Sequence, residues 1–424
     1  MKKIVALFLC VALVVSLAAC GSKKDPEPTK PSSDITEHIS ITWWHTMDSQ
    51  YDSLVNELVD KFNSSQEYIT VVPEYMGSFS DINEALVAAN AAGEGLPGVA
   101  VCNTKFIASY ANNGLFEDLT PYIENTAFDV SNMEPGMYEI GSFGNKQIAM
   151  PFFHNTHVIY YNKDMAEKYN LTIPTEFSEL GDFFKSVKEK TGVTPLSMQS
   201  LDFYYGSFYR NAGVKIIDGD KSDLNSDTAI DITTQLQSWV KNGYISWLEG
   251  NDASSNMKQS FYQGNSFAVL HNSTALEAHQ ESANFNVGVA WYPGVNGMNN
   301  ADLGGGVIGI PAKNSDEVKN AAWQFISYLC GNDTTMKIAT DTGYLPICKD
   351  ALTKDSTSTY LEKFPEYKTV FDNLNKVTPP IIDESASELC KIWQQYMNMI
   401  MLENADVSIS LNNAVTEINE VLAD

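Results

Sequence analysis

The residues of this chain that could do covalent, metal or acid–base chemistry lack the spacings that such chemistry requires. Four cysteines follow residue 100 (Cys102, Cys330, Cys348 and Cys390), and no two of them form a Cys-x-x-Cys pair. The sequence has no Gly-x-Ser-x-Gly elbow, no His-Glu-x-x-His motif and no glycine-rich phosphate loop. We therefore expect no enzymatic activity, no metal and no cofactor.

Two weaker signals remain open at this level. Asp218-x-Asp220-x-Ser222 begins like a calcium loop but lacks the later glycine and glutamate, so we interpret it as a turn. Cys330 and Cys348 either form a disulfide, which is permitted outside the cytoplasm, or remain buried thiols.

Cys20 is the one residue with a specific covalent prediction. Two lysines open the chain, an apolar run covers residues 4–17, and small residues ending at Ala19 precede Cys20. This order is typical of a secretory signal peptide and is too short for a lasting membrane span. It is also similar to a bacterial lipobox, so we expect a lipoprotein signal peptide over 1–19 and lipid attachment at Cys20; secretion with an unmodified thiol is the alternative. Residues 20–37 are rich in Lys, Pro and Ser, which predicts a disordered tether.

The charge balance excludes two classes of partner. The formal net charge is −26, so the protein repels nucleic acid and anionic lipid headgroups. Arg210 is the only arginine. Bidentate clamping of phosphate or carboxylate is chiefly arginine chemistry, so an arginine cluster for a strongly anionic ligand cannot be built.

Strands and amphipathic helices alternate along the chain and would position its loops. A strand over 39–44 precedes a helix whose apolar residues, from Tyr51 to Phe62, recur at spacings of three and four. The alternation predicts an α/β fold of two lobes, each a mainly parallel sheet flanked by helices. Further strands are expected over 69–72, 99–102, 158–161, 214–217, 267–271 and 285–291. Further helices are expected over 104–112, 177–190 and 318–329. Two more helices are expected to begin at caps, one at Ser80-Asp81 and one at Ser226.

Seven motifs in a fixed order carry a family resemblance. They are Thr42-Trp43-Trp44-His45, Gly77-Ser78-Phe79, Pro151-Phe152 with Tyr160-Tyr161-Asn162-Lys163-Asp164, Asp218-Gly219-Asp220 with Leu224-Asn225-Ser226, Phe261-Tyr262-Gln263-Gly264, Gly304-Gly305-Gly306, and Thr342-Gly343-Tyr344-Leu345-Pro346. Through them the chain resembles extracellular solute-binding proteins of ABC importers, in the carbohydrate family of maltose-binding and glycerol-phosphate-binding proteins. The resemblance implies a hinged, two-lobe periplasmic-binding-protein-like fold, a monomer, and a separate membrane permease and ATPase as partners.

The resemblance also implies where the chain passes between lobes. Crossings are expected near 151–156, near 267–272 and after Leu329. The N-lobe would then comprise 38–152 plus 272–329, and the C-lobe 153–271 plus 330–424.

A sugar site needs flat rings for C–H faces and a few fixed polar groups for hydroxyls. In open α/β sheets ligands bind beyond the carboxyl ends of strands, so Trp44 or His45 is expected at the site. The resemblance implies further ligand contacts at Phe79, Asn103, Thr104, His154, Asn155, Phe203, Tyr204, Asn272, Ser273, Gly304, Gly305 and Tyr344. For His154, a structural role is the alternative to ligand contact. For the rings at 203–205, the alternative is ordinary packing in the core.

One departure from the family bears on the solute. Glycerol-phosphate binders hold the phosphate with an arginine on a late helix, whereas Cys390-Lys391-Ile392-Trp393 contains none and offers Trp393 or Lys391. Thr104 likewise replaces an acidic ligand contact. We therefore expect a neutral mono- or oligosaccharide, with glycerol 3-phosphate or a glycerophosphodiester as the alternative; a hydrolase or an adhesin fits less well. Scarce arginine with plentiful lysine and asparagine favours the outer face of a Gram-positive cell membrane.

Overall fold

The computed structural model describes residues 35–423, so the expected signal peptide, Cys20 and most of the tether lie outside the described residues. Within them one mixed sheet has the strand order β2-β1-β3-β11-β6-β9-β7-β8, with β10 paired to β6 and β12 to β11. A separate hairpin pairs β4 with β5. The strands are β1 (Ile39–His45), β2 (Ile69–Tyr75), β3 (Val99–Asn103), β4 (Ser142–Phe143), β5 (Lys146–Gln147), β6 (Met150–Asn162), β7 (Thr194–Gln199), β8 (Ile245–Leu248), β9 (Ser266–Asn272), β10 (Val287–Ala290), β11 (Ala301–Gly309) and β12 (Val377–Thr378).

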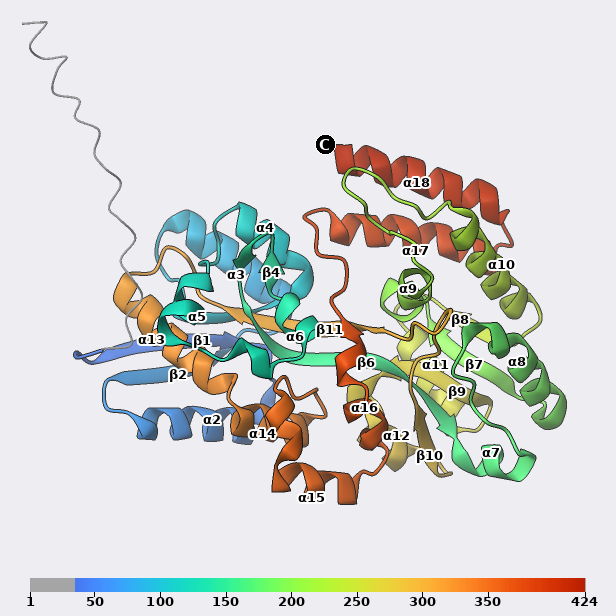
Figure 1. Ribbon diagram of the computed structural model, residues 1–424, viewed down its shortest axis with the longest axis horizontal. Helices are drawn as coiled ribbons and strands as arrows, with labels where there is room; N and C mark the ends of the chain where they lie inside the picture. The colour runs from blue at the N-terminus through green and yellow to red at the C-terminus, as the bar shows by residue number, and fades with distance from the viewer. Residues whose placement is uncertain (1–34, 424) are drawn as a thin grey trace, which may run out of the picture. The chain divides into compact units, whose positions relative to one another are not determined.

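The elements form two groups (Figure 1). The first group contains strands β1, β2 and β3 with the helices beside them, and the second contains β7, β8 and β9 with theirs. The helices are α2 (Asp52–Ser65), α3 (Phe79–Ala92), α4 (Ile107–Asn112), α5 (Thr120–Thr126), α6 (Pro135–Glu139), α7 (Lys163–Tyr169), α8 (Phe177–Thr191), α9 (Asp202–Asn211), α10 (Asp227–Lys241), α11 (Ala253–Tyr262), α12 (Leu276–Ser282), α13 (Asp316–Leu329), α14 (Asn332–Thr342), α15 (Asp355–Lys363), α16 (Tyr367–Phe371), α17 (Ala386–Leu402) and α18 (Val407–Ala423). Short 3₁₀ turns lie at η1 (Ser49–Tyr51), η2 (Thr104–Phe106), η3 (Val130–Asn132), η4 (Ser273–Ala275), η5 (Lys349–Thr353) and η6 (Leu374–Lys376). No helix among residues 35–423 is both long and apolar enough to cross a membrane.

Two strands connect two hydrophobic cores. The first part of β6 pairs with β11 as far as Thr156, and its second part, from His157, pairs with β9. Strand β11 begins with Ala301 in the second core and continues with Leu303 and Val307 in the first core. Figure 1 shows both strands passing from one group of helices to the other. The first core lies around β1, β3 and α13, and the second around β7, α9 and α17.

Two later stretches of the chain contribute to both hydrophobic cores. After β9, Leu276 of α12 and Val287 of β10 belong to the first core, whereas Tyr292 packs in the second core. Strand β10 pairs antiparallel with the end of β6. Residues from Cys330 to Val377 contribute to the first core, whereas α17 and α18 pack in the second.

Several local predictions need correction. Strand β1 pairs parallel with β2 and β3, and β7 pairs parallel with β8 and β9, but β11 enters the sheet antiparallel to both β3 and β6. Helix α3 is capped by Ser78, whose hydroxyl accepts from the Asp81 N–H while the Asp81 carboxylate accepts from Ser78, so the helix starts at Phe79 and not after Ser80. Residues 214–217 form no strand; they lead into a turn bridged between Asp218 and Lys221. Residues 104–112 divide into η2 and α4. The Ser226 cap is confirmed by its bond from the Ala229 N–H.

Candidate functional site

A strand segment without side chains, Gly304-Gly305-Gly306 in β11, forms the centre of the candidate site. Gly305 has φ +106°, and any side chain there would collide with the Phe153 carbonyl. L-residues rarely adopt this conformation, which explains why glycine is needed at this position. The pairing with β6 also shifts between Gly305 and Gly306, where Phe153 is extra and has φ 56°.

Two phenyl rings lie over the flanking glycines. A Cβ on Gly304 would sit 3.0 Å from Phe203 Cε2, and a Cβ on Gly306 would sit 2.6 Å from Phe79 Cε1. Each ring therefore borders one end of the glycine segment. Phe79 begins α3 and Phe203 lies in the first turn of α9, so the two groups of elements contribute one ring each.

Two amides complete this surface. Asn103 lies opposite Gly306 on β3, and Asn155 lies opposite Gly304 on β6. The Asn103 Oδ1 accepts from the Lys105 N–H at 3.1 Å, which leaves its NH₂ group available, and Asn155 has no side-chain hydrogen bond within residues 35–423. Both side chains are half-buried. We call the set Gly304–Gly306, Phe79, Phe203, Asn103 and Asn155 the glycine patch.

The fully buried His154 side chain hydrogen-bonds to the backbone of the glycine patch. Its Nε2 accepts from the Phe152 N–H at 3.2 Å, so Nδ1 carries the proton and donates to the Gly304 carbonyl at 3.1 Å. The His154 carbonyl accepts from the Leu345 N–H at 2.7 Å, and the neighbouring half-buried Tyr344 ring stacks on Phe153 with centroids 5.3 Å apart. His154 therefore hydrogen-bonds to the backbone of the patch, and the Tyr344 ring contacts Phe153, the extra residue of β6 opposite the glycines.

Burial of His154 predicts a pH-dependent stability. Burial lowers its pKa from 6.5 to about 4, and the hydrogen bond to Gly304 opposes this shift only partly. The unfolded chain takes up the proton near pH 6.5 and the folded chain only near pH 4, so protonation favours unfolding as the pH falls. We expect this residue to cost about 3 kcal/mol of unfolding free energy between pH 7 and pH 4. Urea unfolding of His154→Gln should show a correspondingly shallower pH slope, whereas the exposed His38→Gln should not; equal slopes for all three proteins would contradict the assignment.

Seven of the expected contacts are buried and do not form the surface of the glycine patch: Trp44, His45, Thr104, His154, Tyr204, Ser273 and Trp393. Trp44 donates its indole N–H to Glu74 on β2 at 2.9 Å. His45 packs against the Trp43 ring, and its burial lowers its pKa to about 4. Both side chains thus have partners on β1 and β2, since His45 also packs near the Tyr75 ring.

The remaining buried residues have packing or backbone partners. The Tyr204 ring contacts His157 edge-on, with centroids 6.2 Å apart, and the Ser273 Oγ accepts from the Thr156 N–H at 3.2 Å. Half-buried Asn272 accepts from the Thr274 hydroxyl at 2.8 Å. Trp393 is 1% exposed and packs edge-on against two tyrosines, since it lies on the inner face of α17. It packs in the second core, and solute contact at Trp393 stays a prediction.

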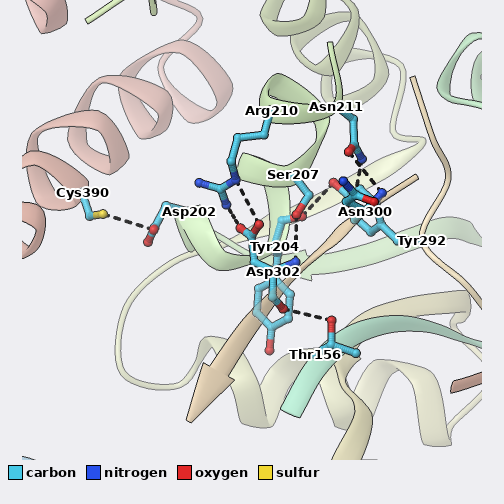
Figure 2. Close-up of polar contacts among 10 residues, drawn as sticks. All are labelled: Thr156, Asp202, Tyr204, Ser207, Arg210, Asn211, Tyr292, Asn300, Asp302 and Cys390. Carbon is cyan, nitrogen blue, oxygen red and sulfur yellow. Dashed lines mark hydrogen bonds and ion pairs between the residues drawn. The ribbon is translucent and has the colours of Figure 1, made fainter. Parts of the chain in front are cut away.

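A polar network beside the patch joins α9 to β11, and Figure 2 shows its members. Arg210 forms an ion pair with Asp302, whose side chain is 2% exposed. Asn211 and Asn300 exchange two hydrogen bonds, of 2.9 and 3.1 Å. The network leaves the only guanidinium of the chain neutralised.

The described residues show no arrangement suited to metal or thiol chemistry. Among residues 35–423 there is no group of three or more His, Cys, Asp or Glu that could hold a metal ion. Cys330 and Cys348 are both buried free thiols, and the Cys348 Sγ donates to the Cys330 carbonyl at 3.1 Å. Burial raises the pKa of both thiols well above 9.

The chain belongs to the bacterial extracellular solute-binding protein family, whose sequence profile matches residues 57–366. It is 25% identical over 368 residues to the sn-glycerol-3-phosphate-binding periplasmic protein UgpB of Escherichia coli, covering 81% of this chain and 82% of that protein. It is 23% identical over 350 residues to UgpB of Rhizobium meliloti, covering 78% and 80%. The protein is thus an extracellular solute-binding protein, and its named relatives are binding proteins and not enzymes.

Solved structures show the same fold. UgpB from Mycobacterium tuberculosis in complex with glycerophosphocholine superposes with a TM-score of 0.77 at 22% identity, covering 91% of this chain and 98% of that one. The sugar-binding protein MalE from Xanthomonas citri has a TM-score of 0.81 at 18% identity, with the same coverage. The chain therefore has the expected periplasmic-binding-protein-like fold, a mixed α/β sheet flanked by helices.

Sequence reasoning missed two features of the site. Phe153 forms the bulge opposite the glycines with φ 56°, and nothing in Phe152-Phe153-His154 indicates a bulge. Asp302 is the partner of Arg210, 92 positions away along the chain. A lone arginine suggests some buried acidic partner, but no sequence pattern selects Asp302.

Proposed function

We propose that this protein is the solute-binding component of an ABC importer and that it captures a neutral mono- or oligosaccharide. The observation that carries the proposal is the glycine patch, where two phenyl rings and two amides border backbone without side chains. Rings of this kind stack on the C–H faces of sugars, and amides hydrogen-bond to hydroxyls. The scarcity of charged groups in the patch fits an uncharged solute, and we propose binding without catalysis.

The capture mechanism follows from where the rings originate. Phe79 is held by α3 of the first group and Phe203 by α9 of the second. A solute that contacts both rings only when the two groups close around it shifts the population toward the closed form. A closed monomer would then deliver the solute to permease subunits, while ATP hydrolysis takes place on separate chains.

Calorimetric titration tests the solute class. The probes are maltose, maltotetraose, glycerol 3-phosphate and glycerophosphocholine. We expect heat from at least one neutral sugar and an affinity loss of about tenfold for Phe79→Ala and for Phe203→Ala, since each removes one stacking ring. Tyr68→Ala, which removes an exposed ring elsewhere, should bind normally. A response to the phosphate compounds without any response to sugar would refute the sugar assignment.

Glycerol 3-phosphate or a glycerophosphodiester is the second candidate. The named UgpB relatives favour it. Its phosphate would need a cation, and the only guanidinium is occupied by Asp302, so lysine or helix N-termini would have to replace it.

We also propose that the protein is held at the outer face of the membrane of a Gram-positive cell by lipid on Cys20. Cys20→Ala removes the thiol that would carry the lipid and should release the protein from the membrane fraction into the medium, because stable anchoring depends on the attached acyl chains. Immunoblots of both fractions measure the shift. Cys390→Ala provides the matched cysteine control and should stay membrane-bound; an unchanged distribution for Cys20→Ala would exclude lipidation as the anchor.

A further inference from the structure

The only arginine of the chain is held in a two-point ion pair. Arg210 lies in the last turn of α9, its Nε donates to Asp302 Oδ1 at 3.0 Å, and its Nη2 contacts Oδ2 (Figure 2). The Arg210 side chain is 26% exposed and the Asp302 side chain 2%. This fork-shaped geometry is specific to a guanidinium, and it leaves no net charge for an anionic solute.

Asp302 also fixes the backbones around it. Its N–H donates to the Ser207 hydroxyl at 3.2 Å, and its carbonyl accepts from the Thr156 hydroxyl at 2.9 Å. Ser207 lies on α9 and Thr156 on β6, so one residue of β11 joins three elements. The Asn211–Asn300 bonds add a second connection between α9 and the start of β11.

This junction lies close to the glycine patch on both elements. Gly304 follows Asp302 by two positions on β11, and Phe203 is seven residues before Arg210 on α9. A helix of this length moves as a rigid body. The contacts of Ser207 and Arg210 therefore fix the position of helix α9, and with it the position of the Phe203 ring. A Cβ on Gly304 would lie 3.0 Å from Phe203 Cε2.

We infer that Arg210 is a positioning residue for solute recognition: through its ion pair with Asp302 it places Phe203 over Gly304, and it does not itself bind solute. The solute class that follows is uncharged. This inference rests on the proposed function, because it concerns the same site.

A double-mutant cycle between Arg210→Lys and Phe203→Ala tests the inference. Lysine keeps the charge beside Asp302 but loses the fork, so the fold is retained while the helix position is relaxed. Titration with maltose and maltotetraose should show an affinity loss of about fivefold to tenfold for Arg210→Lys. In the Phe203→Ala background the same change should cost nothing further, because the ring it positions is absent. If Arg210→Lys folds poorly, Ser207→Ala replaces it in the cycle. Ser207→Ala removes only the hydrogen bond from the Asp302 N–H and should therefore displace α9 less.

A structural role alone would give a different pattern. Lys319→Met breaks a partly buried ion pair with Glu117 in the first core, at 2.7 Å, and should lower the unfolding midpoint without changing affinity. Additive losses in the cycle, with either variant, would overturn the inference. Loss of glycerol 3-phosphate or glycerophosphocholine binding in Arg210→Lys would also overturn it, by making Arg210 a phosphate ligand. If the unchanged protein binds none of the four probes, the proposed function fails, and the inference fails with it.

Discussion

Gly304→Val should abolish detectable solute binding while leaving the protein folded. Even a single Cβ at this position would lie 2.9 Å from Asn155 Oδ1 and 3.0 Å from the Phe203 ring. Both neighbours are half-buried side chains that border the glycine patch, so the added methyl groups would displace them and fill the space where solute would stack. We expect an affinity loss of about 100-fold or more, which corresponds to about 2.8 kcal/mol or more.

The control for this change is Gly331→Ala. Gly331 caps α14 with φ −73°, a conformation that alanine adopts readily, and it lies outside the glycine patch. Calorimetric titration with maltotetraose and thermal unfolding of both variants separate binding from stability. Normal affinity in Gly304→Val would mean that the solute does not approach β11, and the candidate site would be misplaced.

Asp302→Ala should produce the largest loss of stability of any single change considered. It removes the partner of Arg210 and leaves a guanidinium in a partly buried position without its counter-charge. It also removes the side-chain link between α9 and β11, whereas the backbone hydrogen bonds of residue 302 to Ser207 and Thr156 remain. Removing one member of a buried ion pair costs about 3–5 kcal/mol, and partial exposure of Arg210 places the expectation near the lower end, about 3 kcal/mol.

Urea unfolding at pH 7 measures this loss. Asp302→Asn keeps the shape and one acceptor, so it should be less destabilised than Asp302→Ala. Asp372→Ala removes the partner of Lys368 in an exposed i,i+4 pair and should cost less than about 1 kcal/mol. A loss for Asp302→Ala as small as that for Asp372→Ala would show that the Arg210 pair contributes little to folding.

The local predictions succeed where short-range patterns dominate. Apolar residues at helical spacing identified α2, α8 and α13, and the Ser226 cap was read correctly from its neighbours. The predictions fail where pairing depends on distant segments. Strand β11 inserts antiparallel between β3 and β6, and no pattern in the sequence predicts that insertion.

The candidate site shows the same division. Phe79, Asn103, Asn155, Phe203 and Gly304 were expected contacts, and they meet in the glycine patch. Trp393 was expected there too, but helix α17 turns its apolar face, and Trp393 with it, toward α9. Residue type does not distinguish a ring that covers a core from one that borders a solute, because both are apolar and aromatic.

By itself the sequence determined the kind of protein: alternating strands and helices, a glycine segment with aromatic residues, and seven ordered motifs, all of which depend on residues near one another along the chain. Only the tertiary structure decided which rings border the glycines, that Phe153 forms a bulge beside them, and that Arg210 is neutralised by Asp302. These contacts join residues as far as 227 positions apart, such as Phe79 and Gly306. The packing of the whole chain sets such distances, and no local pattern encodes them.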